Sequence, residues 1–381
     1  MSSTVSDKED KRFIDAALRL ARKHQGLTGT NPSVGCIIVA DLGYGPVIVG
    51  SAVTAWGGRP HAEPPALEEA GEYAKGATAY VTLEPCSHHG KTPPCAQALI
   101  DAGVQRVVTA ISDPDNRVNG QGHAMLQAAD VEVCEMDGGE FAGRVIQGYL
   151  KARSGFLPFV TLKLAMDRDG LIGCMQTGNL KISCRGSMLQ THLARARHDA
   201  ILVGSGTVLA DDPQLTCRLP GMEHRSPVRV VLDSKHKLTE DFKLVSTARD
   251  VQTWVVAPSE APDEWTTMIR QNGIQHIPAE MDGDRIALPE MFEDLAARGI
   301  QSVMVEGGAE LAKSLLRDDM VDEIIVHVGG TPEAPENRAD AIYACFKPDV
   351  PPEGFEIVQE LKFGNDVSLR LRKQENECLQ A

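Results

Sequence analysis

Apolar and polar positions in the first half of the chain follow strand-like and helix-like periods in turn. Apolar residues between 13 and 21 recur at helical spacing, and a capping-box sequence at Ser6–Glu9 predicts where that helix begins. Short apolar runs bounded by glycine and proline then predict a helix at 95–102 and strands at 34–40, 47–52, 79–82 and 106–111. This alternation predicts an α/β layered domain over residues 1–153.

The second half has a similar alternation but a different sequence. A polar stretch at 151–155 separates the two halves, and apolar runs predict strands at 159–165, 200–203, 228–232, 253–256, 302–305 and 323–328. Segments with helical spacing lie between these runs. We therefore predict a second α/β domain over residues 154–381. Because no internal repeat is visible, we do not expect it to be a copy of the first.

Composition narrows the class of protein. The length of 381 residues suits two or three domains at roughly 150 residues each, and 42% hydrophobic with 24% charged residues is ordinary for a globular protein. The net charge of −15, with no run of Lys and Arg, argues against a nucleic-acid partner. No stretch approaches the ~18 apolar residues of a membrane span, and no secretory signal is visible. Nine cysteines in such a chain favour reduced thiols and a cytoplasmic location.

The most informative residues of the first half form a metal-ligand pattern. Glu63 stands two residues after His61. Cys86 follows a predicted strand, and Cys95 begins the next predicted helix. One imidazole and two thiolates suit zinc and leave a fourth position for water. This His-x-Glu and Pro-Cys arrangement is typical of zinc nucleobase deaminases, in which the glutamate moves protons. We predict one Zn²⁺ per chain on His61, Cys86 and Cys95, with Glu63 as the catalytic residue; the alternative is a buried histidine with two unrelated thiols.

Eight residues separate the two cysteines and form a loop beside the predicted metal. The loop carries His88, which can hydrogen-bond a substrate, and Lys91, whose ammonium group suits a phosphate. The alternative interpretation is an ordinary solvated loop.

Two glycine-rich turns follow predicted strands in the second half. The turn at 306–311 opens a helix, where backbone N–H groups can cradle a phosphate, although such a turn also occurs as a simple strand-to-helix connection. The turn at 204–207 is followed by Leu209, which breaks the G-x-G-x-x-G pattern. A Rossmann dinucleotide domain is therefore not expected.

Both halves resemble one family. The segments 31–36, 61–63, 82–95 and 113–116 resemble the first domain of the bifunctional riboflavin-biosynthesis deaminase/reductases, the RibD family. The segments 162–165, 199–218 and 303–308 are similar to the reductase half of the same family. The resemblance implies an α/β chain with a cytidine-deaminase-like domain followed by a dihydrofolate-reductase-like domain that uses NADPH.

The resemblance also implies two reactions and their residues. The first is hydrolytic deamination of 2,5-diamino-6-(5-phosphoribosylamino)pyrimidin-4-one, with Asn31 at the base and His88 and Lys91 at the ribosyl phosphate. The second is reduction of the ribosyl group of 5-amino-6-(5-phosphoribosylamino)uracil to ribityl, with Lys163 and Glu306 as candidate proton carriers. The implied NADPH contacts are Ala165, Lys181, Thr207, Asp211, Ser234 and Gly308, and the implied substrate contacts are Asn179, Arg195, Leu215, Arg218 and Glu306.

Two other functions stay open at this point. A deaminase of a polynucleotide such as transfer RNA has the same zinc pattern, although the acidic charge balance counts against it. The loop around Asn179 and Lys181 departs from the family's usual sequence, so the second domain could instead be a non-catalytic binding or oligomerisation module. We expect a homo-oligomer that acts on a small phosphorylated pyrimidine, away from membranes.

Overall fold

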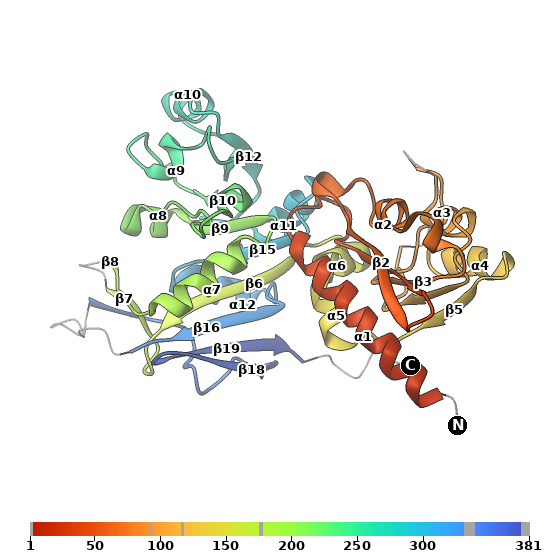
Figure 1. Ribbon diagram of the computed structural model, residues 1–381. Coiled ribbons are helices and arrows are strands. Elements are labelled where there is room, and N and C mark those ends of the chain that lie inside the picture. Colours follow the sequence, from red (N-terminus) through yellow and green to blue (C-terminus); the bar gives the residue numbers. More distant parts are fainter. Residues whose placement is uncertain (1–2, 91–92, 116–117, 175–177, 331–339, 375–381) are drawn as a thin grey trace, which may run out of the picture. The chain divides into compact units, whose positions relative to one another are not determined.

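A computed structural model describes residues 3–90, 93–115, 118–174, 178–330 and 340–374 of the chain (Figure 1). The chain divides into two compact units, Met1–Phe156 and Leu157–Ala381, each with its own sheet and core. Helix α6 (Gln147–Gly155) ends the first unit and continues past the predicted boundary at residue 153. Among the described helices, none is long and apolar enough to cross a membrane.

A five-stranded sheet organises the first unit, in the order β2-β1-β3-β4-β5. Strand β1 pairs antiparallel with both β2 and β3, whereas β3, β4 and β5 run parallel. The bounds are β1 (Gly35–Asp41), β2 (Pro46–Val53), β3 (Thr78–Val81), β4 (Arg106–Thr109) and β5 (Glu132–Glu135). The predicted strands are confirmed as β1 to β4. Strand β5 was missed because its four residues, EVCE, contain only two apolar positions between two glutamates.

Helices pack against this sheet. Their bounds are α1 (Ser3–Ala21), α2 (Glu63–Ala70), α3 (Cys95–Asp101), α4 (Gln121–Ala128) and α5 (Gly139–Val145), followed by α6. Helix α1 is already formed at Ser6, so the prediction that a capping box there begins the helix is wrong. Its apolar face is buried, and a Cβ atom at Gly35 of β1 would lie 2.2 Å from the carbonyl oxygen of Ala17. Only glycine therefore allows the helix to pack this closely on the strand.

A nine-stranded sheet organises the second unit, in the order β12-β11-β10-β9-β15-β6-β16-β19-β18 (Figure 1). The strands from β12 to β16 run parallel, and β19 and β18 add an antiparallel hairpin beside β16. The bounds are β6 (Phe159–Met166), β9 (Ala200–Gly204), β10 (Val228–Leu232), β11 (Thr253–Pro258), β12 (Gln275–Ala279), β15 (Ser302–Val305), β16 (Glu323–Val328), β18 (Phe355–Phe363) and β19 (Asp366–Lys373). All six predicted strands are confirmed, whereas β12, β18 and β19 were missed.

Helices and two small sheets complete the second unit. The helices are α7 (Arg185–Arg195), α8 (Ser205–Asp211), α9 (Lys243–Ser246), α10 (Asp263–Gln271), α11 (Leu288–Ala297) and α12 (Ala309–Arg317). The small sheets are β17 (Ala341–Tyr343) with β7 (Leu171–Cys174) and β8 (Gly178–Asn179), and the hairpin of β13 (Met281–Asp282) and β14 (Arg285–Ile286). Because neighbouring parallel strands end at one edge of a sheet, the segments after β9, β10 and β15 gather there, which is where ligands bind in open α/β sheets.

Candidate active sites

The three predicted metal ligands meet in the first unit. His61 precedes α2, Cys86 follows β3, and Cys95 begins α3; their ligand atoms all lie within 4.8 Å of one another. The Nδ1 atom of His61 is 3.8 Å from Sγ of Cys86 and 3.4 Å from Sγ of Cys95. The backbone N–H of Cys95 donates to Sγ of Cys86 at 3.3 Å. One imidazole nitrogen and two sulfurs therefore converge on one point.

The chemistry of these donors fits zinc. A hydrogen bond from Cys95, supported by His61, lowers the pKa of Cys86 to about 4, so that thiolate forms readily. The same hydrogen bond and the burial of the side chain raise the pKa of Cys95. Two adjacent thiolates repel each other unless a cation lies between them, and zinc is the divalent ion that prefers this set of nitrogen and sulfur ligands.

Glu63 lies beside these ligands with one carboxylate oxygen unused. The residue begins α2, is 4% exposed, and its Oε2 atom is buried without a hydrogen-bond partner among the described residues. Burial raises the pKa of the Glu63 carboxyl, and the nearby charge of Cys86 raises it further. A buried carboxylate with a free oxygen beside a metal position is suited to accept a proton from water.

Glu84 has a structural role that the sequence did not reveal. Its buried carboxylate accepts hydrogen bonds from four backbone N–H groups, those of Asp113, Gly120, Gly122 and His123, at 2.9 to 3.3 Å. These bonds fix the start of α4 against the loop that carries Cys86. Glu84 lies within segment 82–95, which resembles the family's first domain. Its structural role becomes visible only from its hydrogen-bond partners, which lie 29 to 39 residues farther along the chain.

Asn31 and His88, two of the three predicted substrate contacts of the first unit, lie outside its helices and strands. Asn31 packs against Gly58, where the Nδ2 atom of Asn31 would be 2.3 Å from an added Cβ atom. The Nδ1 atom of His88 is buried and has no hydrogen-bond partner among the described residues, so it is available to bind a ligand. Lys91 lies outside the described residues.

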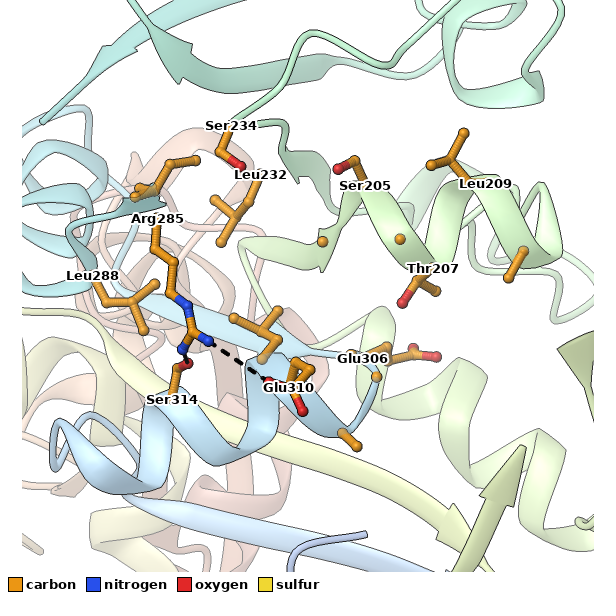
Figure 2. A pocket seen from close by; sticks show the side chains of 18 of the residues that line it. Ser205, Thr207, Leu209, Leu232, Ser234, Arg285, Leu288, Glu306, Glu310 and Ser314 are labelled. Carbon is orange, nitrogen blue, oxygen red and sulfur yellow. Dashed lines mark hydrogen bonds and ion pairs between the residues drawn. The ribbon is translucent and has the colours of Figure 1, made fainter. Parts of the chain in front are cut away.

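A pocket of about 1730 Å³ opens at the sheet edge of the second unit (Figure 2). It contains most of the residues predicted for NADPH or the second substrate, namely Ala165, Arg195, Thr207, Asp211, Leu215, Arg218, Ser234, Glu306 and Gly308. Two other predicted contacts, Lys181 and Asn179, are not among the lining residues. Lys181 is exposed and does not line the pocket, and the side chain of Asn179, in β8, lies outside the described part of the structure.

The two glycine-rich turns lie next to each other in the lining of this pocket. Gly308 precedes α12, and a Cβ atom added to Gly308 would lie 3.8 Å from Oγ1 of Thr207, at the start of α8. Gly204 and Gly206 have open space where their side chains would be. Free backbone on both walls fits a phosphate-bearing cofactor such as a dinucleotide.

A buried ion pair forms the floor of the pocket next to Lys163. The Nε and Nη2 atoms of Arg195, in α7, donate to the two carboxylate oxygens of Glu306 at 2.6 and 2.8 Å. Burial alone would raise the pKa of Glu306. The positive charge of Arg195 and its hydrogen bonds outweigh that effect and lower the pKa to about 2. Burial lowers the pKa of Lys163, and the charge of Glu306 opposes that effect. Lys163 can therefore give up a proton more easily than an exposed lysine.

Replacing Arg195 by alanine should destabilise the second unit by about 3–5 kcal/mol, because it leaves Glu306 buried and unpaired. In the unaltered protein the low pKa of Glu306 stabilises the fold above the ordinary value of 4.5, and this contribution is lost as the pH falls through about 2. Denaturant unfolding followed by the fluorescence of Trp254 and Trp265, both buried in this unit, measures the change. The double replacement with Glu306→Ala should recover part of the loss; no recovery would show that the pair is not the cause.

The chain between α8 and β10 presents Leu215 and Arg218 to the pocket. Leu215 has φ of 54°, a left-handed conformation that costs free energy in a non-glycine residue. Arg229, fully buried in β10, holds this segment by donating from Nη1 to the carbonyl of Gln214 at 3.3 Å, and it donates to Thr247 and Thr253 as well. Arg218 itself is exposed, so its guanidinium can reach a ligand.

Comparisons with known proteins match a family model to each unit. Residues 7–111 match the cytidine and deoxycytidylate deaminase zinc-binding region, and residues 158–331 match the RibD C-terminal domain. The first unit is thus a zinc-dependent deaminase domain, and the second a reductase domain of the RibD type. The predicted fold class is confirmed.

Full-length relatives identify the family. The chain is 38% identical to riboflavin biosynthesis protein RibD of Escherichia coli, over 95% of this chain and 99% of that protein. It is 37% identical to RibD of Bacillus amyloliquefaciens, over 94% and 95%. The structure of Acinetobacter baumannii RibD superposes with a TM-score of 0.82 at 32% identity, covering 97% of this chain and 99% of that one. The chain belongs to the RibD family of bifunctional deaminase/reductases.

The name of a further relative of known structure includes both a deaminase and a reductase activity. The Thermotoga maritima protein described as a diaminohydroxyphosphoribosylaminopyrimidine deaminase/5-amino-6-(5-phosphoribosylamino)uracil reductase is 29% identical, with a TM-score of 0.81 and coverage of 96% of this chain and 99% of that one.

Proposed function

We propose that this protein deaminates 2,5-diamino-6-(5-phosphoribosylamino)pyrimidin-4-one and then reduces the ribosyl group of the product to ribityl with NADPH. The observation that carries the proposal is the pairing of two sites in one chain: His61, Cys86 and Cys95 beside Glu63, and a separate pocket around Glu306. The Thermotoga maritima relative bears the same two activities in its name.

In the deamination, water replaces the amino group of the pyrimidine and ammonia leaves. His61, Cys86 and Cys95 would hold zinc, which when bound makes water nucleophilic near neutral pH. Glu63 Oε2 accepts the proton of the attacking water and returns it to the departing amine. Asn31 orients the base, while His88 Nδ1 and Lys91 serve the ribosyl-phosphate end.

In the reduction, the sugar ring opens and C1′ gains one hydride, with one further proton consumed overall. NADPH, when bound, supplies that hydride. Lys163 and the Arg195–Glu306 pair line the pocket where the reacting carbon would lie, and the half-buried lysine can deliver the proton. Arg195 uses two of its nitrogens on Glu306, so it orients that carboxylate, and Arg218 is left to hold the phosphate.

NADPH oxidation by the purified protein tests the second activity. With 5-amino-6-(5-phosphoribosylamino)uracil present, we expect absorbance at the reduced nicotinamide band to fall; without this compound it should stay constant. Ammonia release from the diamino compound, without any NADPH oxidation, would instead support a deaminase whose second domain binds or assembles but does not catalyse.

Arg218→Ala should raise the KM for the second substrate about tenfold and change kcat little, because a charge-assisted contact to phosphate is lost in the bound substrate and the transition state alike. Steady-state NADPH oxidation measures both constants. Ammonia release by the same variant is the internal control and should match the unaltered protein. An unchanged KM would show that Arg218 does not bind the substrate and is an ordinary solvated surface arginine.

The remaining expectations concern the protein in the cell. We propose a cytoplasmic homo-oligomer that acts on small phosphorylated pyrimidines and not on nucleic acid, in line with its net charge of −15. Formation of inosine or uridine in transfer RNA would overturn the claim that the protein does not act on nucleic acid. Light scattering of the purified protein tests whether it is a homo-oligomer.

A further inference from the structure

The side chain of His192 contacts the segment that presents Arg218 to the reductase pocket, and neither proposed reaction uses it. His192 lies in the last turn of α7, as Arg195 does. Residues 212–218 belong to no helix or strand, so contacts with neighbouring elements determine the path of this segment. Arg218 lines the pocket, whereas His192 is not among the lining residues. His192 can therefore influence a ligand through the segment that it contacts.

Two residues of this segment are fixed by side chains other than His192. The carbonyl of Thr216 accepts a hydrogen bond from Nη1 of Arg195 at 3.0 Å. The backbone N–H of Cys217 donates to Oγ of Ser226 at 3.1 Å. Cys217 is also only 1% exposed, so its side chain anchors the segment in the interior of the unit. The backbone is thus held up to the residue before Arg218.

His192 supplies the contact at Arg218 itself. The backbone nitrogen of Arg218 lies 3.3 Å from Nδ1 of His192, and the same Nδ1 atom lies 3.2 Å from the carbonyl oxygen of Thr216. One ring nitrogen cannot accept one hydrogen bond and donate another at the same time, so the position of the imidazole proton decides between the two contacts. The Thr216 carbonyl already has a donor in Arg195, whereas the Arg218 N–H has no other acceptor among the described residues. The contact with Arg218 is therefore the one that depends on His192.

The surroundings of His192 keep its imidazole in the form that this contact needs. Burial lowers the pKa of His192, and the positive charges of Arg195 and Arg218 lower it further. The Thr216 carbonyl and the charge of Glu306 act in the opposite direction without reversing the shift. A neutral imidazole carries one proton, and when that proton is on Nε2, the Nδ1 atom is free to accept from the Arg218 N–H.

We propose that His192 is a positioning residue for the second substrate: by accepting a hydrogen bond from the backbone of Arg218, it holds that residue where its guanidinium meets the substrate phosphate. The inference rests on the proposed reductase function and on Arg218 as the phosphate contact. A long side chain that starts from a fixed backbone loses less conformational freedom when it binds, so the contact with His192 strengthens binding without touching the ligand. The chemical step does not depend on it.

Titration calorimetry on the full chain without NADPH measures binding apart from turnover. For 5-amino-6-(5-phosphoribosylamino)uracil, we expect His192→Leu to weaken binding about fivefold, a usual effect of losing one hydrogen bond. The same compound without its phosphate should bind to the variant and to the unaltered protein with affinities within about twofold, because Arg218 then has no phosphate to meet. In turnover assays with NADPH, the KM should rise as the affinity falls, with kcat changed by less than about twofold.

Three further variants separate positioning from a general effect on the fold. His192→Asn offers a carboxamide oxygen as many bonds from the backbone as Nδ1, so it should restore most of the affinity. In an Arg218→Ala background, His192→Leu should cause no further loss, because no guanidinium remains to be positioned. Arg185→Leu replaces an exposed arginine that begins α7 and does not line the pocket, and this variant should bind both compounds normally.

Several results would contradict the proposal. Equal weakening of both compounds by His192→Leu, or a loss that adds fully to that of Arg218→Ala, would show that His192 only supports the fold of this unit. An asparagine variant that restores no affinity would show that the Nδ1 contact is not the cause. Unaltered protein that binds the substrate but does not oxidise NADPH would overturn the reductase function alone, and the binding differences would still decide the role of His192. Unaltered protein that binds neither compound would overturn both.

Discussion

Glu63→Gln should reduce the rate of ammonia release by roughly 10²–10⁴-fold, the usual contribution of a positioned proton carrier, and leave one zinc per chain. The substitution keeps the size of the side chain and its position at the start of α2, but the amide cannot accept the proton of the attacking water. Because Glu63 Oε2 has no partner among the described residues, the replacement breaks no hydrogen bond that we observe at that atom.

The measurement is an ammonia assay run beside metal analysis of the same sample. Glu68→Gln is the matched control, because Glu68 is an exposed glutamate on the same helix and should keep full activity. NADPH oxidation with the deaminated substrate should also be normal, which checks the fold of the second unit. Turnover within a few-fold of the unaltered rate would remove Glu63 from the mechanism.

Cys86→Ser should abolish zinc binding and reduce ammonia release to background. A neutral hydroxyl replaces the thiolate whose low pKa makes it the readiest ligand, and two remaining protein ligands hold zinc far less firmly. Cys95→Ser should have the same result. Metal analysis and the thermal midpoint of the first unit provide readouts that do not depend on catalysis.

Cys134→Ser provides the matched control, since Cys134 lies in β5 and is not among the grouped ligands. If the Cys86 variant folds poorly, chelation of the unaltered protein and later addition of zinc addresses the same question: activity should disappear and return. A metal-free protein with full deaminase activity would contradict the zinc assignment.

The sequence predicted those parts of the fold whose signal is local. Strands such as β10 and β15 are compact apolar runs, and the metal ligands stand within a recognisable motif spanning 61–95. Strand β18 was missed because it mixes charged residues with exposed apolar ones such as Ile357 and Leu361, as an edge strand with one open side does. Strand β12 includes Pro278 and lies at the opposite edge.

Contacts between distant residues were beyond the reach of sequence patterns. The family resemblance predicts that Arg195 contacts the substrate, and the sequence did not reveal that its guanidinium pairs with Glu306, 111 residues later. Glu84 had no assigned role, because its backbone partners lie 29 to 39 residues away and only the folded chain brings them near. Lys181 is exposed and is not among the residues that line the pocket, so its predicted cofactor contact stays a prediction.

The order of strands in the large sheet has a consequence for synthesis on the ribosome. Strand β16 lies in the interior of the sheet, yet one of its two neighbours, β19, spans residues 366–373. Until that segment has emerged, the growing protein exposes the backbone edge of a strand whose side chains Ile324 and Val326 belong to the core. Nascent chains interrupted after β16 should therefore aggregate or recruit chaperones, although every described residue that lines the reductase pocket except Ile342 has already been made.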